Sequence, residues 1–309
     1  SIYKNLIGIK LNNPDEYAEF QSELVVYHDD YGDYSTNEPT MDGTASLIYL
    51  LAAKEGTSPK PSPKERASEE SLNKQFSYSH GAIVRGDSTQ KKIALVFTGD
   101  EFADGGNFIA QTLQKQKVKA SFFLTGRFYQ NPAFKKIVQR LRKDKHYLGP
   151  HSNEHLLYCD WNNRDSLLVT KEQFSDDLLV NLDIMKGEGI NTPDLKYFLP
   201  PYEWYNDSIV AWTNDLGMQL INFTHGTNST ADYTWPGLKN YKSSENIYNS
   251  VIKYEKSSPR GLNGFVLLLH IGTDPKRIDK FYTRLPALIT WLKAKGYQFQ
   301  TVNQFLKRD

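Results

Sequence analysis

The sequence predicts an α/β barrel formed by seven alternations of a strand with a helix. Two observations support this fold class. From Ile93 onward, short apolar runs recur along the chain, and segments with helical spacing of apolar residues lie between them. Such regular alternation is typical of parallel strands that share one sheet, and its repetition favours a barrel over a sandwich.

The predicted strands are short apolar runs, most of them bounded by polar or turn-forming residues. The seven runs are Ile93–Phe97, Val118–Leu124, Tyr147–Leu148, Tyr197–Leu199, Gln219–Phe223, Phe265–His270 and Gln298–Val302.

The predicted helices have apolar residues three or four positions apart, which places those residues on one face. Five such groups are Phe108/Ile109/Leu113, Phe134/Ile137/Val138/Leu141, Leu178/Leu179/Leu182/Met185, Ile209/Val210/Leu216 and Leu285/Leu288/Ile289/Leu292. A sixth helix is expected over Glu245–Lys256, with Ser243-Ser244 as its N-cap, and a short seventh over Asn303–Lys307.

The pattern changes near residue 80. We expect residues 79–309 to form the barrel and residues 1–78 to form an N-terminal extension with a linker. Met41–Ala53 is expected to contain a short helix. The following Ser58–Lys64 stretch is rich in proline and lysine, which is typical of an extended, solvated linker.

The composition mainly excludes classes of function. A net charge of +1 without a basic stripe argues against nucleic acid as a partner. No apolar run approaches the roughly 20 residues that a membrane span requires, and no signal peptide is visible. Because the chain starts at Ser1, an export signal could have been removed before this point. The single Cys159 excludes an internal disulfide.

Two histidines four residues apart, His151 and His155, are the strongest indication of chemistry. If this segment takes a helical turn, both imidazoles face one point. An acidic residue from elsewhere, such as one of Asp100-Glu101, could then complete a His/His/carboxylate metal site. The pair alone could be a coincidence of composition.

Other polar residues follow predicted strands and strengthen this interpretation. Asp100-Glu101 follows the first strand, Pro201-Tyr202 follows the fourth, and His270 ends the sixth. In parallel barrels the working groups come from the carboxyl ends of strands, so these residues are expected on one rim.

These segments resemble the polysaccharide deacetylases, the NodB-homology group known as carbohydrate esterase family 4. The resemblance covers about residues 80–309. It rests on Ile93–Phe97 before an acidic loop, Lys119–Gly126, His151-Ser152-x-x-His155, Phe198–Tyr202 and Leu268–His270. It implies a distorted (β/α)7 barrel, a divalent metal that is commonly zinc, an acetylated glycan as substrate, and export to the periplasm or the extracellular space.

The resemblance also implies roles for individual residues. Asp100, His151 and His155 would hold the metal, since Asp100 is short and close to its strand. Glu101 or Asp104 would be the general base, with Glu101 favoured, and His270 the general acid. The Tyr202 backbone N–H would face the oxyanion. Trp161, Trp204 and Tyr202 would contact the sugar, although packing beneath loops is an equal explanation for each tryptophan.

The chain departs from the family in its first and third motifs. In the ungapped register, Thr98 and Gly99 occupy the places of two aspartates, and Leu199 that of an arginine. The fourth motif has no clear counterpart, Asp232 and Trp235 being the nearest candidates. A catalytically inactive, glycan-binding barrel of the same fold is therefore the alternative to an active enzyme.

The N-terminal segment has a second, weaker resemblance. Residues 28–52, which include Asn37-Glu38, are similar to the C-terminal stretch of family 9 glycoside hydrolases. Glu38 would correspond to that family's general acid. A glycosidase needs two carboxylates, and the partner acids would lie upstream of this chain, so we expect no glycosidase activity. An acidic surface loop explains the segment equally well.

Overall fold

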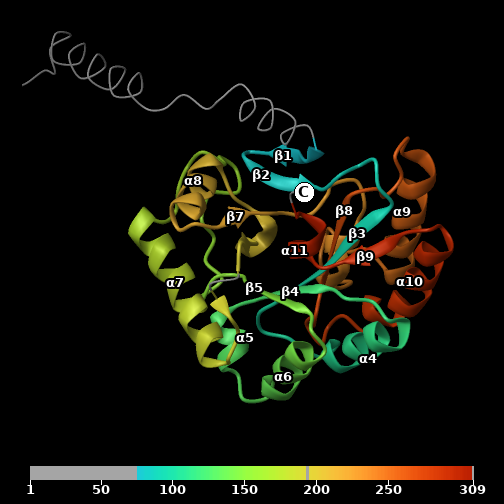
Figure 1. Ribbon diagram of the computed structural model, residues 1–309, viewed down its shortest axis with the longest axis horizontal. Coiled ribbons are helices and arrows are strands. Elements are labelled where there is room, and N and C mark those ends of the chain that lie inside the picture. Colours follow the sequence, from blue (N-terminus) through green and yellow to red (C-terminus); the bar gives the residue numbers. More distant parts are fainter. Residues whose placement is uncertain (1–74, 193–194, 308–309) are drawn as a thin grey trace, which may run out of the picture. The chain divides into compact units, whose positions relative to one another are not determined.

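The computed structural model describes residues 75–192 and 195–307 (Figure 1). The predicted helix over Met41–Ala53, the proline-rich linker and the segment around Glu38 all lie outside the described residues. Within the described residues, none of the helices combines the length and the apolar character needed to cross a bilayer.

The centre of the fold is a parallel sheet in the order β8-β3-β4-β5. It is formed by β3 (Lys92–Gly99), β4 (Ser121–Leu124), β5 (Tyr147–Pro150) and β8 (Phe265–His270). A further strand, β9 (Gln298–Gln300), pairs in parallel with the first residues of β3. These five strands confirm five of the predicted ones.

The predicted fourth and fifth strands also form but are short. β6 (Tyr197–Phe198) and β7 (Gln219–Leu220) make a separate two-stranded parallel sheet. An antiparallel hairpin, β1 (Ser77–Ser79) and β2 (Ala82–Arg85), extends the main sheet beside β8. In the described part of the chain the strand ladder therefore curls without forming a continuous ring, and the closed seven-stranded barrel is not confirmed.

The seven predicted helices all form (Figure 1). Most of them lie around the outside of the sheet, whereas the last one packs with residues of the concave interior. They are α4 (Gly106–Gln116), α6 (Lys135–Lys143), α7 (Lys171–Gly187), α8 (Asp207–Asp215), α9 (Ser244–Ser257), α10 (Leu285–Ala294) and α11 (Val302–Phe305). Ser243 caps α9 as expected, since its side chain accepts a hydrogen bond from the Asn246 N–H. The five-residue helix α5 (Gly126–Gln130) was not predicted.

Side chains along β3 and β8 point alternately toward the outer helices and into the concave interior of the sheet. This alternation determines which residues face the site. In β3, Ile93, Leu95 and Phe97 pack with the outer helices. Ala94 and Val96 point the other way, into the concave interior. Because side chains alternate, Thr98 continues this interior row. The same parity in β8 carries His270 into the interior above Leu268.

Candidate functional site

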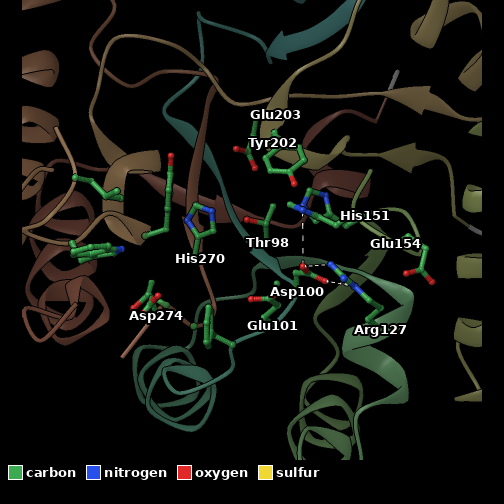
Figure 2. Close-up of a pocket in the computed structure, with 18 of the residues that line it drawn as sticks. Thr98, Asp100, Glu101, Arg127, His151, Glu154, Tyr202, Glu203, His270 and Asp274 are labelled. Atoms are coloured by element: carbon green, nitrogen blue, oxygen red, sulfur yellow. Dashed lines mark hydrogen bonds and ion pairs between the residues drawn. The ribbon is translucent and has the colours of Figure 1, made fainter. Parts of the chain in front are cut away.

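One cavity of about 740 Å³ lies at the carboxyl ends of the strands. Seven of the eight residues nominated from the sequence line it: Asp100, Glu101, His151, His155, Trp161, Tyr202 and His270. Figure 2 shows several of them converging on the Thr98 end of β3. The prediction that strand ends bring these residues to one place is therefore confirmed. Trp204 is the exception and is not among the lining residues.

His151 stands at the buried floor of the cavity, directly after β5. Its Nδ1 lies 2.7 Å from the carbonyl oxygen of Leu199, and its backbone N–H donates to Asn181 Oδ1 at 3.1 Å. With Nδ1 used in this way, Nε2 is the free ring nitrogen. Burial, reinforced by nearby His155, holds the pKa of His151 well below its ordinary value, so the ring is neutral.

His155 comes close to His151, but not through a helical turn. Residues 151–157 form a loop, and Ser152 (φ 72°) and His155 (φ 56°) adopt left-handed backbone conformations. The Ser152 hydroxyl accepts the His155 N–H at 2.9 Å, and the two imidazole centroids lie 5.1 Å apart. The helical turn considered for this segment does not form, but the loop still brings the two imidazoles close together. Burial lowers the pKa of His155 to about 4, against the attraction of Asp100.

Asp100 faces the histidine pair from the end of β3. Its Oδ1 accepts from the Thr125 hydroxyl at 2.8 Å, and Arg127 donates to both oxygens at 3.2 and 2.6 Å. Thr125 also caps α5, since its hydroxyl accepts from the Phe128 N–H. The unpredicted helix α5 thus positions Arg127 on Asp100, as Figure 2 shows.

These three side chains have the donor atoms of a metal site, but those atoms do not converge closely enough to coordinate one ion. Asp100 Oδ2 and His155 Nδ1 are 4.0 Å apart, too far for a hydrogen bond. Among the residues described, no three His, Cys, Asp or Glu side chains converge tightly enough to hold an ion as they stand. Two neutral imidazoles and a carboxylate are nevertheless the donor set that zinc prefers. The Arg127 side chain is 42% exposed, and its two hydrogen bonds occupy both oxygens of Asp100.

His270 stands across the cavity and is held by Asp232. The Asp232 carboxylate contacts His270 Nδ1 at 2.6 Å and accepts the His270 backbone N–H at 2.9 Å. Burial alone would lower the pKa of His270, but the charge and hydrogen bond of Asp232 raise it above the ordinary value. The ring therefore holds a proton more firmly than a free histidine, with Nε2 left to face the cavity. The sequence had offered Asp232 only as a motif candidate, not as this partner.

Two carboxylates of the acidic loop after β3, Asp104 and Glu101, have different surroundings. Asp104 accepts from the Thr273 N–H at 2.8 Å and pairs with Lys280 at 3.0 Å, and it does not line the cavity. Asp104 is therefore an anchor for the loop rather than a candidate base. Glu101 does line the cavity, with its side chain exposed.

A further carboxylate in the cavity, Glu203, was missed in the sequence. It follows Tyr202 in the turn after β6, within the 3-10 segment Pro201–Glu203. Burial raises the pKa of Glu203 to about 7; the charge of His270 opposes this shift and that of Asp232 adds to it. Glu203 could have been found from the sequence, because it comes directly after Pro201-Tyr202, a segment already expected at the end of the fourth strand.

Aromatic side chains continue from the histidines to the rim. Tyr202 packs on His155 with centroids 4.4 Å apart, and Trp161 meets the Tyr202 ring edge-on at 5.6 Å. Trp161 is 53% exposed. Trp204 lies behind it, between Trp161 at 5.5 Å and the Arg164 guanidinium at 3.6 Å. The structure therefore places Trp204 as a support for Trp161 rather than on the cavity wall.

Comparison with known proteins gives a consistent result. Residues 85–221 match the family model of polysaccharide deacetylase. A peptidoglycan-N-acetylglucosamine deacetylase from Bacillus cereus is 26% identical over 224 residues, covering 71% of this chain and 90% of the relative. Peptidoglycan-N-acetylmuramic acid deacetylase PdaA from Bacillus subtilis is 26% identical over 229 residues, covering 74% and 76%.

A solved structure of a pseudoenzyme is similar to this chain in fold. A family 4 carbohydrate esterase pseudoenzyme from Bacillus anthracis superimposes with a TM-score of 0.56 at 20% identity, covering 74% of this chain and 70% of that one. A mutant of that pseudoenzyme, also similar in fold, is described as having restored enzymatic activity. The fold thus accommodates both active and inactive proteins.

Proposed function

We propose that this protein is a metal-dependent hydrolase of carbohydrate esterase family 4, which removes acetyl groups from a polysaccharide or oligosaccharide. The match of residues 85–221 to the polysaccharide deacetylase model and the similarity to two peptidoglycan deacetylases support this proposal. One observation carries the proposal. A pair of neutral imidazoles beside a carboxylate faces, across one cavity, a histidine whose pKa is raised by Asp232. Metal-assisted hydrolysis of an amide or ester uses these two kinds of group, a metal site and a general acid.

Asp100, His151 and His155 would hold a divalent metal, for which zinc is our first choice. When bound, such an ion polarises a carbonyl and makes water nucleophilic near neutral pH. The hydrogen bond from His151 to the Leu199 carbonyl fixes that ring, as partners of metal-binding histidines do. The low pKa values of both histidines keep them unprotonated, which binding requires.

Proton transfers fall to side chains on the walls. His270 donates a proton from Nε2 to the departing amine or hydroxyl oxygen, and Asp232 stabilises the imidazolium before this step. A carboxylate accepts the proton of the attacking water, for which Glu101 is the residue nominated by the sequence. The Tyr202 backbone N–H is the nominated donor to the oxyanion.

The glycan would lie along the aromatic rim. Trp161 and Tyr202 offer ring surface on one side of the cavity, and Tyr233 and Trp235 line another part of it. Apolar faces of pyranose rings suit such surfaces. Peptidoglycan is a cell-wall polymer, and it is named for both curated relatives described above. Export of this protein is accordingly part of the proposal.

The test is substitution of a proposed metal ligand. His155→Ala should abolish zinc binding, measured by titration calorimetry, and acetate release from acetylated chito-oligosaccharides. His225→Ala is the matched control, because His225 is exposed and does not line the cavity. Full activity of metal-free protein, or of His155→Ala, would refute the proposal.

An inactive glycan-binding barrel is the second candidate. Two observations favour it. The donor atoms of the three proposed ligands do not converge closely enough to coordinate one ion, and one solved structure of similar fold is a pseudoenzyme. Bound metal alone would not separate the candidates, because an inactive protein can keep its ligands. Turnover separates them.

A further inference from the structure

The turn that contains Glu203 has a strained backbone, and this backbone directs the Glu203 side chain toward the cavity. Tyr202 (φ 58°) and Glu203 (φ 54°) are consecutive residues in the left-handed region, which disfavours residues with a Cβ. The turn is held by the Glu203 N–H, which donates to the Pro200 carbonyl at 3.1 Å, and by Asn222, which donates to the Glu203 carbonyl at 2.8 Å. Strain that the surroundings maintain in this way is characteristic of functional sites.

Among the described residues, the Glu203 carboxylate has no hydrogen-bond or ion-pair partner. The side chain is nevertheless only partly exposed and borders the cavity. Figure 2 shows it entering on the Tyr202 side, near Thr98 and His270. Beneath it, the Thr98 hydroxyl is buried and also lacks a hydrogen-bond partner. Two unpartnered polar groups facing one space make a place for a water molecule.

The other carboxylates of the cavity are engaged or exposed. Asp100 is bound by Thr125 and Arg127. Glu154 accepts from the Asn153 side chain, and Asp274 accepts from the Lys276 N–H. Asp232 is buried against His270, just behind the lining. Glu101 shares with Glu203 the lack of a partner, but its side chain is exposed to solvent.

We propose that Glu203, rather than Glu101, is the general base of the deacetylase reaction. This inference rests on the proposed function. As the water oxygen forms its bond to the acetyl carbon, Glu203 takes one water proton. As the bond from that carbon to the sugar nitrogen or oxygen breaks, His270 gives its Nε2 proton to the leaving atom. Acetic acid and the free amine or hydroxyl result. Acetic acid releases the second water proton to solvent as acetate, and the proton on Glu203 passes to His270, which restores both residues.

The geometry distinguishes this from the arrangement expected in the sequence. In the arrangement expected from the sequence, the acid His270 comes from β8 and the base Glu101 comes from the loop after β3. Here the base comes from the turn after β6, next to the residue nominated for the oxyanion. A pKa of Glu203 raised to about 7 by burial suits a group that must accept a proton near neutral pH and release it again.

The experiment compares two isosteric substitutions in the metal-loaded protein, with acetate release from chito-oligosaccharides, peptidoglycan fragments and acetylated xylan. Glu203→Gln should lower kcat by about 10²–10⁴-fold. KM and zinc affinity should stay within about threefold, because a general base adds little to ground-state binding. Glu245→Gln, at an exposed position in the first turn of α9, is the control and should match the wild type.

A second variant keeps the result independent of folding. Glu203→Gly relieves the left-handed strain, so its Tm should equal or exceed that of the wild type while kcat falls at least as far. Activity of Glu203→Gln within about threefold of the wild type, or a large loss in Glu101→Gln alone, would overturn the assignment and leave the proposed function standing. An inactive wild type with metal bound would overturn both.

Discussion

Replacing Asp232 by Asn tests the acid half of the proposed chemistry. The Asp232 side chain is 4% exposed. Among the described residues its two oxygens contact His270 alone, at 2.6 Å from Nδ1 and 2.9 Å from the backbone nitrogen. The substitution removes the negative charge but keeps the shape. The His270 ring should then lose the attraction that raises its pKa, while burial, which lowers it, persists.

The size of the effect follows from the closeness of the pair. An opposite charge within about 4–6 Å shifts a pKa by about 1–3 units, and one unit corresponds to about 1.4 kcal/mol. The alkaline limb of the kcat/KM profile, which reports loss of the His270 proton, should move down by about 1–3 pH units in Asp232→Asn. At a pH above the wild-type limb, kcat/KM should therefore fall by about 10–1000-fold.

The assay is acetate release between pH 5 and pH 10 with metal supplied in excess. Asp183→Asn, on an exposed position of α7, is the control and should keep the wild-type profile. An alkaline limb that stays in place in Asp232→Asn would refute the role of the pair.

The same pair predicts a pH dependence of stability. Because the folded-state pKa of His270 is raised, its contribution to the free energy of unfolding is complete below the ordinary histidine pKa of about 6.5. The contribution is lost as pH rises through the folded-state pKa. Urea unfolding at pH 6 and pH 9 should show this loss in the wild type and not in Asp232→Asn.

Three further predictions concern the core, a buried histidine and the rim. Phe122→Ala should lower the free energy of unfolding by about 3–5 kcal/mol in urea titrations, because Phe122 is fully buried and stacks on Phe97 at 5.0 Å; a loss below about 1 kcal/mol would contradict this packing. Burial lowers the pKa of His146 to about 4, so the wild type should lose about 3 kcal/mol as pH falls from 6.5 to 4, and His146→Gln should lose clearly less. Trp161→Ala should raise KM for chito-oligosaccharides by about tenfold with kcat unchanged; an effect on kcat instead would exclude a simple binding platform.

The strands and helices were predictable because each has a local signature. Seven apolar runs and seven amphipathic segments correspond to the strands and helices observed from β3 to α11. The helix α5 is only five residues long, too short to show a period. Closure of the barrel was not predictable either, since β6 and β7 pair over two residues each, and pairing between strands is not contained in periodicity.

The site was predictable as far as strand ends determine it. Asp100, His151, Tyr202 and His270 each follow or end a strand, so a parallel sheet brings them to one cavity. The contacts that hold these side chains in place are long-range and were not visible in the sequence. Asp232 reaches His270 across 38 residues, and Arg127 reaches Asp100 through a helix that the sequence did not indicate. Glu203 depended on a left-handed turn, a conformation that the residues Tyr202 and Glu203 do not favour.

Acetate release from acetylated chito-oligosaccharides, peptidoglycan fragments and acetylated xylan tests the central claim most directly. It is measured on the purified protein, then after chelation, and again after zinc or cobalt is added back. We expect release from at least one substrate, its loss on chelation and its return with metal. No release from any of the three while metal is demonstrably bound would contradict a deacetylase and favour the glycan-binding barrel.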